Sequence, residues 1–250
     1  MLKIENFEVL GWEHAIRGMR NPMNSWEKSD SNFFDDSEGH VCNICQGHGP
    51  MSLIEIGPND YALMKNLRNA GTDHRKFMRM ITVYLDITAP LYWWKEFDTY
   101  KVGTVANSCS TMHMIHAKEF DVNDFSHEHI EELDSDEYNM SYDWLLRTVD
   151  ILNYYRKKYN AASEKLKRDI TDAERKHVLA QQKLFWRQMI QLLPTSYNQK
   201  RTVMLNYEVL ANIYKSRRNH KLDEWLTFCD WIEELPYSEL ITGKEYEVEE

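Results

Sequence analysis

The segment Ile81-Thr82-Val83-Tyr84-Leu85-Asp86-Ile87, which is followed by Pro90, decides the fold class. Its β-branched residues and its proline boundary predict a strand. Pro90 then opens a helical turn that is expected to reach Phe97. Further towards the N-terminus, residues 1–10 predict another strand, because their apolar residues come close to alternating.

The rest of the chain is predicted to be largely helical. Helices are expected at residues 12–20, from Asn59 or Asp60 to Asn69, and at 142–168, 171–193, 202–216 and 221–235. Ser141 and Thr171 are the expected N-caps, and Gly71 and Pro194 are the expected stops. Because we find no internal repeat and no low-complexity linker, the sequence predicts one α+β domain over residues 1–250, with a helical second half.

Composition excludes several classes of protein. Hydrophobic residues make up 42% and charged residues 28% of the 250 residues, which is typical of a globular chain. Thirty basic and forty acidic residues give a net charge of −10, which argues against a nucleic-acid partner. No apolar run approaches the ~18 residues of a membrane span, and the first residues lack an apolar signal core. We therefore expect a cytoplasmic protein with no membrane partner.

Residues 21–58 form a predicted irregular loop that holds a possible metal site. His40, Cys42, Cys45 and His48 place two imidazoles and two thiols within nine residues. A C-x-x-C pair with two flanking histidines offers the four ligands of a tetrahedral zinc ion. The alternative is two incidental cysteines in a polar loop, since four cysteines in the chain do not make a disulfide scaffold.

A polar run follows a dense block of aromatic residues and suggests a nucleobase pocket. The run is Asn107-Ser108-Cys109-Ser110-Thr111-Met112-His113, and Trp93 and Trp94 belong to the aromatic block before it. Rings for stacking beside short polar donors suit a flat heterocycle. Runs of this kind also occur in ordinary buried strands. Cys109 is a candidate nucleophile if a neighbouring cation lowers its pKa.

The C-terminal third holds a further group of polar residues, Asn206, Asn212, Arg217 and Arg218. Their spacing of six and five residues does not form one tight helical stripe. By pattern alone they fit a surface helix whose basic residues lie near its C-terminal dipole.

Three stretches together resemble the flavin-dependent thymidylate synthase family. The resemblance is carried by Gly71-Thr72-Asp73-His74-Arg75-Lys76-Phe77-Met78-Arg79 with Ala89-Pro90, by Asn107 to Met112, and by Leu193-Pro194, Thr202-Val203-Met204-Leu205-Asn206, Asn212 and Arg217. The second stretch is similar to the end of the signature R-H-R-x-x-S-x-N-E-x-S-x-R. The third is similar to the family's L-P, T-x-N, Asn and Leu-Arg. The similarity covers about residues 60–116 and 185–235.

The resemblance implies a fold, an assembly and a reaction. The fold is a twisted sheet flanked by helices, like that of the thymidylate-synthase-complementing proteins, in a homotetramer with active sites between subunits. FAD is reduced by NADPH and passes reducing equivalents to dUMP, while methylenetetrahydrofolate supplies the carbon. No cysteine nucleophile is required.

The resemblance also implies roles for residues of this chain. Arg217 matches the arginine that polarises the uracil by its spacing to Asn212, whereas Arg218 matches it if the alignment is made on Trp225. Asn206 and Asn212 match flavin-contacting asparagines, and Ser110 matches a serine beside the dUMP phosphate and base. The expected substrate-binding residues are Lys101, Asn107, Ser108, Cys109, Ser110 and Arg187, and the expected cofactor-binding residues are Tyr100, Lys101, Asn206 and Asn212.

The chain departs from the family pattern at several positions. Tyr100, Lys101 and Val102 stand where the family has Arg-His-Arg; Ser108, Met112 and Ile190 stand where it has a glutamate and two arginines. Because phosphates favour guanidinium partners, either Lys95, Lys101, Arg187 and Lys200 rebuild the phosphate site or the ligand has changed.

The first hypothesis is therefore methylation of a pyrimidine deoxynucleotide, dUMP to dTMP or a close analogue. The second is a catalytically altered or inactive relative that binds a nucleotide or flavin in a regulatory or assembly role. The third is a different nucleotide chemistry that depends on Cys109.

Overall fold

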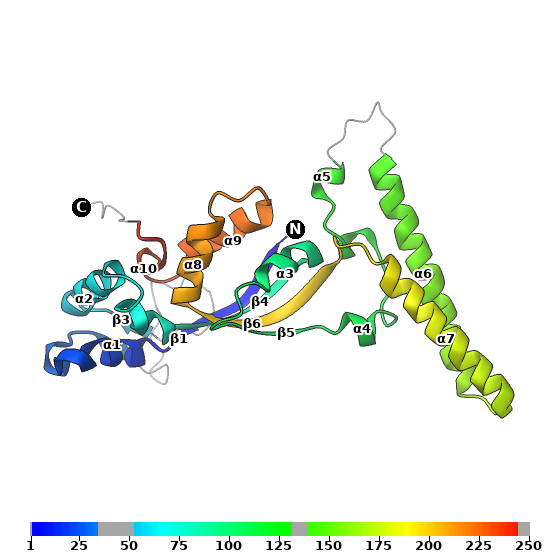
Figure 1. Ribbon diagram of the computed structural model, residues 1–250, viewed down its shortest axis with the longest axis horizontal. Helices are drawn as coiled ribbons and strands as arrows, with labels where there is room; N and C mark the ends of the chain where they lie inside the picture. Colours follow the sequence, from blue (N-terminus) through cyan, green and yellow to red (C-terminus); the bar gives the residue numbers. More distant parts are fainter. Residues whose placement is uncertain (1, 35–52, 132–139, 245–250) are drawn as a thin grey trace. The chain divides into compact units, whose positions relative to one another are not determined.

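The computed structural model describes residues 2–34, 53–131 and 140–244 (Figure 1). The strands are β1 (Lys3–Leu10), β2 (Asn32–Phe34), β3 (Leu53–Glu55), β4 (Thr82–Pro90), β5 (Val105–Ser108) and β6 (Asn198–Asn206). The α-helices are α1 (Trp12–Arg20), α2 (Pro58–Asn69), α3 (Leu91–Phe97), α4 (Thr111–Met114), α5 (Glu128–Glu131), α6 (Met140–Leu166), α7 (Asp172–Leu192), α8 (Tyr207–Arg217), α9 (Asp223–Glu233) and α10 (Glu239–Thr242). None of the helices in these ranges is long and apolar enough to cross a membrane.

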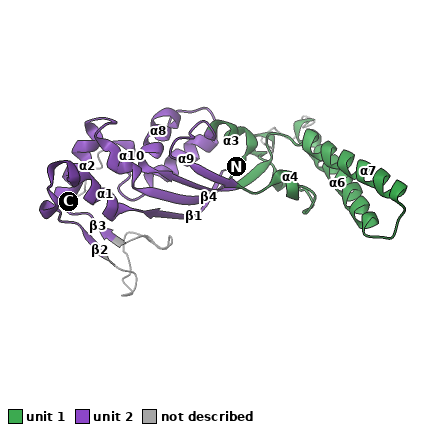
Figure 2. Ribbon diagram, turned by 60° about the horizontal axis from the view of Figure 1, so that its bottom comes forward, with its two compact units in different colours: residues 1, 88–96, 108–200 green, residues 2–87, 97–107, 201–250 purple. Residues whose placement is uncertain are grey.

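The chain groups into two compact units (Figure 2). Unit 1 holds residues 1, 88–96 and 108–200, and unit 2 holds residues 2–87, 97–107 and 201–250. The chain passes from one unit to the other within β4, β5 and β6, so neither unit is a continuous segment. The single domain that the sequence predicts stays a prediction.

A four-stranded sheet with the strand order β1-β4-β6-β5 confirms the predicted α+β class. The strand predicted from Ile81 is confirmed as β4, in which Val83, Leu85 and Ile87 are buried and alternate with more exposed residues. Asp86 ties the neighbouring strands of unit 2 together: its carboxylate accepts hydrogen bonds from Asn6 Nδ2 (3.0 Å) and Thr202 Oγ1 (2.6 Å).

The helix predicted over 202–216 is wrong in its first turn and a half. Residues 202–206 belong to β6, where Val203 and Leu205 are buried and their neighbours are not. The helix α8 begins only at Tyr207, and Asn206 is its N-cap. The apolar pattern changes from period two to period 3.6 within a few residues, and a helical reading of the whole window misses that change.

The segment before α2 also differs from its prediction. The loop expected over 21–58 contains β2 and β3, which pair antiparallel with Phe33 opposite Ile54. The N-cap of α2 is Gly57, with Pro58 as the first helical residue, and not Asn59 or Asp60.

Asp60, which is not the N-cap of α2, lies at the centre of a buried polar cluster in unit 2. Its carboxylate accepts a hydrogen bond from Arg20 Nε at 2.6 Å, and both side chains are almost completely buried. Ser29 and Ser31 donate their hydroxyls to the other oxygen, each at 2.7 Å. Burial raises the pKa of Asp60, but the two serines and Arg20 outweigh it and hold the pKa below its usual value.

Unit 1 is built around the hairpin of α6 and α7, which lie side by side (Figure 1). Its core contains Leu145, Leu152 and Met189, with partly buried aromatic residues around them. Thr171 caps α7, as predicted, and the structure adds that it forms a capping box with Glu174. Ser141 is not a cap, because α6 has already begun at Met140.

Candidate functional site

In unit 2, four residues predicted for the site gather around the turn at residues 100–104. Tyr100 is the link to Arg217, whose Nε donates a 3.0 Å hydrogen bond to the Tyr100 hydroxyl. The guanidinium carbon lies 4.7 Å from the ring centroid of Trp225 and 5.7 Å from that of Tyr100. Two aromatic faces therefore fix the Arg217 cation in place.

A pocket of about 260 Å³ opens at the same turn. It is lined by Phe97, Asp98, Tyr100, Lys101, Thr104 and Ala106. Within the described ranges, the Thr104 hydroxyl is buried without a hydrogen-bond partner. Because such a group is costly to leave unpaired, it is a reason to expect a polar ligand atom or water here. Lys101, which is exposed, adds a positive charge to the wall.

Asn206 lies against the backbone of this turn. Its Oδ1 accepts a 3.0 Å hydrogen bond from the Val209 amide, which caps α8. A Cβ on Gly103, which has φ +78°, would stand 2.9 Å from Asn206 Nδ2. Only glycine leaves that approach open. The cap uses the oxygen of the amide, so its NH₂ group remains available as a donor.

Asn212 belongs to a different cluster. Its Oδ1 accepts a 3.1 Å hydrogen bond from Arg75 Nη2, and Arg75 also binds Glu208. Arg79 forms a second ion pair with Glu208. Burial alone would raise the pKa of Glu208. The hydrogen bonds and charges of Arg79 and, to a smaller extent, Arg75 outweigh burial, so the pKa lies below its usual value. This network joins the segment 71–79 to α8.

The two neighbouring arginines at the end of α8 have different surroundings. Arg218 Nη1 lies 2.5 Å from Asp230 Oδ1, and its Nε lies 3.3 Å from Glu233 Oε1. A uracil edge would have to compete with these carboxylates for Arg218. Arg217 lies beside the Tyr100 pocket, and the geometry therefore favours Arg217 over Arg218 as the cation of the site.

Unit 1 contains the predicted residues Ser108, Cys109, Ser110 and Arg187. Ser110 is the N-cap of α4, and its Oγ accepts a 3.2 Å hydrogen bond from the His113 amide. Cys109 is exposed, and in the described part of the chain no cationic side chain bonds its thiol. Burial raises the pKa of the other described cysteine, Cys229, to about 11. A raised pKa makes Cys229 a poor thiolate nucleophile.

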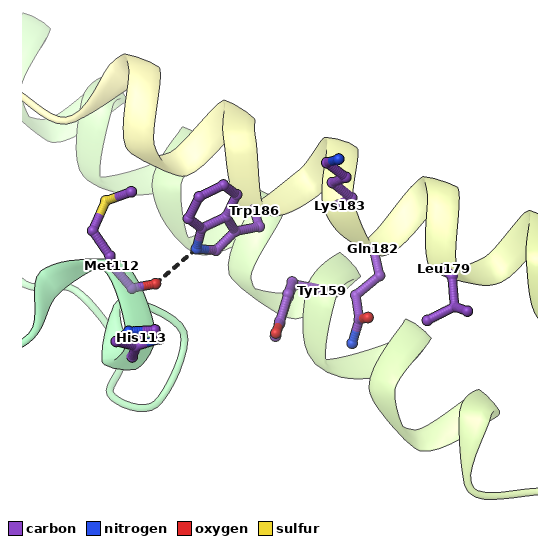
Figure 3. A pocket seen from close by; sticks show the side chains of 7 residues that line it. All are labelled: Met112, His113, Tyr159, Leu179, Gln182, Lys183 and Trp186. Carbon is purple, nitrogen blue, oxygen red and sulfur yellow. Dashed lines mark hydrogen bonds between the residues drawn. The ribbon is translucent and has the colours of Figure 1, made fainter.

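An open groove of about 670 Å³ lies between α4 and the helical hairpin of unit 1 (Figure 3). It is lined by Met112, His113, Tyr159, Leu179, Gln182, Lys183 and Trp186. The Trp186 indole is held in place, because its Nε1 donates a 2.8 Å hydrogen bond to the Met112 carbonyl. Gln182 is likewise fixed by a 2.7 Å bond to the Ser163 hydroxyl. The groove therefore offers a rigid ring wall and fixed polar groups.

Lys183 lines this groove, and Arg187, which is not a lining residue, lies one turn further along α7. Both side chains are exposed. Residues four apart on a helix are neighbours, so the two cations can reach one anionic group. Ile190, at the position where the family has an arginine, packs against the core of unit 1 instead.

Other sequence predictions have different outcomes. Trp93 and Trp94 are fully buried, and Trp94 Nε1 donates to the Gln199 carbonyl at 2.9 Å, so these rings cannot stack on a ligand. The dense aromatic pattern reflects a core.

Ser108 ends β5, and Asn107 is exposed on the same strand. His40, Cys42, Cys45 and His48 lie outside the described residues, and no metal-binding group of three or more His, Cys, Asp or Glu occurs in the described part.

The sequence did not single out several residues of these two sites. Thr104 in unit 2, and Tyr159, Lys183 and Trp186 in unit 1, have no motif around them. Trp225 serves in the sequence only as an alignment point for Arg218, and its contact with Arg217 is not predicted. Tyr159 and Trp225 are distant in sequence from the predicted residues, and only the folded structure brings them to the sites. Thr104 is three residues from Lys101, and Trp186 is next to Arg187, but neither has a signal of its own.

The fold is that of the flavin-dependent thymidylate synthases. Over 97% of this chain and 98% of the other, it is similar to thymidylate synthase X (ThyX) from Helicobacter pylori with FAD and dUMP, with a TM-score of 0.59 and 13% sequence identity. A second structure of the Helicobacter pylori enzyme complexed with FAD and dUMP gives a TM-score of 0.57 and 14% identity over 96% of this chain and 98% of that one.

A third similar structure is the UMP/dUMP methylase PolB from Streptomyces cacaoi bound with 5-Br dUMP. It matches with a TM-score of 0.51 and 12% identity over 97% of this chain and 95% of that one. No family model and no curated protein sequence matches the chain.

Proposed function

We propose that this chain is a flavin-dependent methyltransferase that converts dUMP, or a close pyrimidine deoxynucleotide, to its 5-methyl product. NADPH and methylenetetrahydrofolate are the proposed co-substrates. The single domain, the homotetramer and the cytoplasmic location that the sequence predicts are part of the proposal. One observation carries it: the fold matches, over nearly its whole length, structures that hold FAD and dUMP or 5-Br dUMP.

The residues around the turn at 100–104 fit a flavin. Asn206 has an NH₂ group that its capping bond does not use, Thr104 has a buried hydroxyl, and Lys101 carries a charge that suits a phosphate. Bound flavin would supply the reducing equivalents that turn the transferred carbon into a methyl group. The protein's part is to hold the ring and phosphates and to exclude water.

Arg217 is the proposed electrophilic group. A guanidinium offers two parallel donors to the O2, N3 and O4 edge of a uracil. Negative charge builds on that edge when ring carbon five reacts, and a cation that is already fixed lowers the barrier. Trp225 and Tyr100 hold Arg217 in one orientation before any ligand arrives.

The groove of unit 1 is the proposed nucleotide-binding surface of that unit. Lys183, which lines the groove, and Arg187, one turn beyond it on α7, are suited to the phosphate. The fixed Trp186 indole is suited to stacking on a base or sugar face. Ser110 and Cys109, which precede α4, are the expected neighbours of the ligand. This arrangement replaces the arginines that the family has at Met112 and Ile190.

A second candidate function is nucleotide or flavin binding without catalysis. It is favoured by Ile190, whose place in the core removes one of the family's nucleotide-binding arginines. The two functions differ in turnover, and binding measurements alone do not separate them.

Flavin binding is expected to depend on Asn206. The variant Asn206→Asp keeps the capping oxygen, so the free energy of unfolding should stay within about 0.5 kcal/mol of the wild type. It loses the two amide donors, so the FAD dissociation constant from fluorescence quenching should rise at least tenfold. Equal FAD affinity in the two proteins would remove Asn206 from the flavin site, and a wild type without FAD binding would contradict the proposal.

Nucleotide binding is expected to depend on the two cations of α7. The double variant Lys183→Gln with Arg187→Gln should weaken dUMP binding at least tenfold in calorimetry, since phosphate recognition loses both charges. Lys176→Gln is the matched control, because Lys176 is exposed on the same helix but lies about two turns from Lys183, away from the groove lining. If all three proteins bind dUMP equally, the groove is not the phosphate site.

A further inference from the structure

His220 lies next to the Arg217 guanidinium, in the segment that joins α8 to α9. Its Nε2 is 2.9 Å from Arg217 Nη1, and its backbone amide donates a 2.9 Å hydrogen bond to the Arg217 carbonyl. The imidazole is half-buried and meets the Trp225 ring edge-on, with the two ring centroids 6.3 Å apart. Backbone and side-chain contacts therefore fix the imidazole beside the cation of the proposed site.

The hydrogen bonds of the imidazole decide which of its nitrogens carries the hydrogen. The Leu222 amide donates to His220 Nδ1 at 3.2 Å, and a backbone N–H can only donate. Nδ1 must therefore keep its lone pair, so the hydrogen of the imidazole is on Nε2. Leu222 is the N-cap residue of α9, and the start of that helix holds its amide in place.

Two hydrogen-bond donors thus meet at one point. The guanidinium nitrogen Nη1 has no lone pair, and His220 Nε2 carries the imidazole hydrogen, although the two nitrogens are only 2.9 Å apart. Neither nitrogen can accept from the other. An oxygen atom within hydrogen-bond distance of both nitrogens accepts from both at once. The pair is therefore suited to one oxygen on which negative charge develops.

Tyr100 adds a third donor at the same guanidinium. Its hydroxyl oxygen accepts the 3.0 Å hydrogen bond from Arg217 Nε, so its own hydrogen must point away from the guanidinium. Tyr100 also lines the pocket at the turn of residues 100–104. The surroundings of Arg217 therefore favour a ligand edge that is rich in acceptors.

We propose that His220 is a specificity-determining residue, which together with Arg217 selects a pyrimidine with an oxygen at ring position four over one with an amino group there. The inference rests on the proposed function, in which Arg217 meets the O2, N3 and O4 edge of a uracil. The uracil O4 is an acceptor that Arg217 Nη1 and His220 Nε2 can share. Cytosine has an NH₂ group at this position, and its hydrogens would face two further donors.

The discrimination is expected to be large because the wrong base leaves these donors unpaired. A site that is built to hydrogen-bond one ligand group rejects an analogue without that group far more strongly than an apolar pocket does. We therefore expect the wild type to bind dUMP at least about a hundredfold more tightly than dCMP. Arg217 contributes to this ratio, and substitutions at position 220 measure the share of the imidazole.

The test is the ratio of the dCMP to the dUMP dissociation constant, measured by calorimetry on the full chain. His220→Asn can place an amide oxygen near the Nδ1 position and keep the Leu222 bond, but it brings no donor to the Nε2 position. His220→Gln can bring an amide NH₂ group to that position. We expect the ratio to fall at least about tenfold in His220→Asn and to stay within about threefold of the wild type in His220→Gln.

His220→Glu separates a donor to the ligand from a mere support for Arg217. A glutamate offers only acceptors, so it would hold the guanidinium in an ion pair and would also accept from the amino group of cytosine. Its ratio should therefore be lower than that of His220→Asn. A wild-type ratio in His220→Asn or His220→Glu, or a wild type that does not prefer dUMP, would overturn the proposal.

Lys221→Asn is the control, because Lys221 is the next residue and is exposed. If it lowers the ratio as much as His220→Asn does, the selectivity does not come from the imidazole. The ratio is measured without turnover, so the two proposals fail separately. A wild type with the expected ratios that does not methylate dUMP contradicts the enzyme alone, whereas methylation of dUMP with equal ratios in all variants contradicts only the role of His220.

Discussion

Replacement of Arg20 by methionine is expected to cost about 3–5 kcal/mol of folding free energy, the largest stability effect that we predict. The methionine keeps much of the side-chain volume but leaves the fully buried Asp60 carboxylate without its cation. Ser29 and Ser31 remain as donors and cannot neutralise the charge. Urea denaturation measures the loss as a lower midpoint.

Arg17→Met is the control for this variant. Arg17 lies on the same helix and reaches Glu13 at 3.8 Å, but both side chains are more than half exposed. Exposed pairs of this kind contribute less than about 0.5 kcal/mol. If Arg20→Met and Arg17→Met unfold at the same urea concentration, the buried pair does not stabilise the fold.

The same cluster should make stability depend on pH in one direction. Asp60 has a lowered pKa in the folded protein, so its stabilising contribution is present above the unfolded value, near pH 4, and is lost as the pH falls through the folded value. The denaturation midpoint of the wild type should therefore fall more steeply below about pH 4 than that of Asp60→Asn, which has no proton to gain. Parallel pH profiles would contradict this assignment.

Replacement of Arg217 by alanine is expected to have the largest effect on function. Turnover of dUMP, or its affinity, should fall more than tenfold, which corresponds to at least about 1.4 kcal/mol. The physical reason is that the cation lies beside the Tyr100 pocket and its orientation is fixed by aromatic rings. Calorimetry with dUMP and steady-state kinetics together separate affinity from turnover.

Arg218→Ala is the matched control, because Arg218 is the next residue and pairs with Asp230 and Glu233. Its loss should change dUMP binding less than twofold. If Arg217→Ala binds and turns over dUMP like the wild type, Arg217 is not the electrophilic group. An effect confined to Arg218→Ala would show that the alternative register is the correct one.

Local signals in the sequence predict much of this fold. Thr171 and Glu174 specify the start of α7, and the β-branched run from Ile81 specifies most of β4, because caps and alternation act within a few residues. The boundary between β6 and α8 at Asn206 is not predicted by such local signals. There a strand runs straight into a helix, and a short apolar window fits both periods.

The sites are less predictable because they depend on tertiary contacts. Sequence spacing alone does not distinguish Arg217 from Arg218 as the cation of the site. The structure does, because Arg218 forms ion pairs with two carboxylates of the following helix, α9. Trp186 donates its hydrogen bond to the carbonyl of Met112, which is 74 residues earlier in the sequence. No local sequence motif therefore predicts the groove. For Trp93 and Trp94 the sequence suggested a ligand-stacking surface that the structure does not have. A dense aromatic segment can equally be part of a buried core, and both of these rings are buried.

Mass spectrometry of the nucleotide after incubation is the most direct test of the proposed reaction. The purified chain is mixed with dUMP, FAD, NADPH and methylenetetrahydrofolate, and matched mixtures omit FAD or contain Arg217→Ala. We expect a methylated nucleotide in the complete mixture, none without FAD in flavin-stripped protein, and at least tenfold less with Arg217→Ala. A wild type that binds FAD and dUMP but forms no methylated product would contradict the enzyme and leave the nucleotide-binding relative in its place.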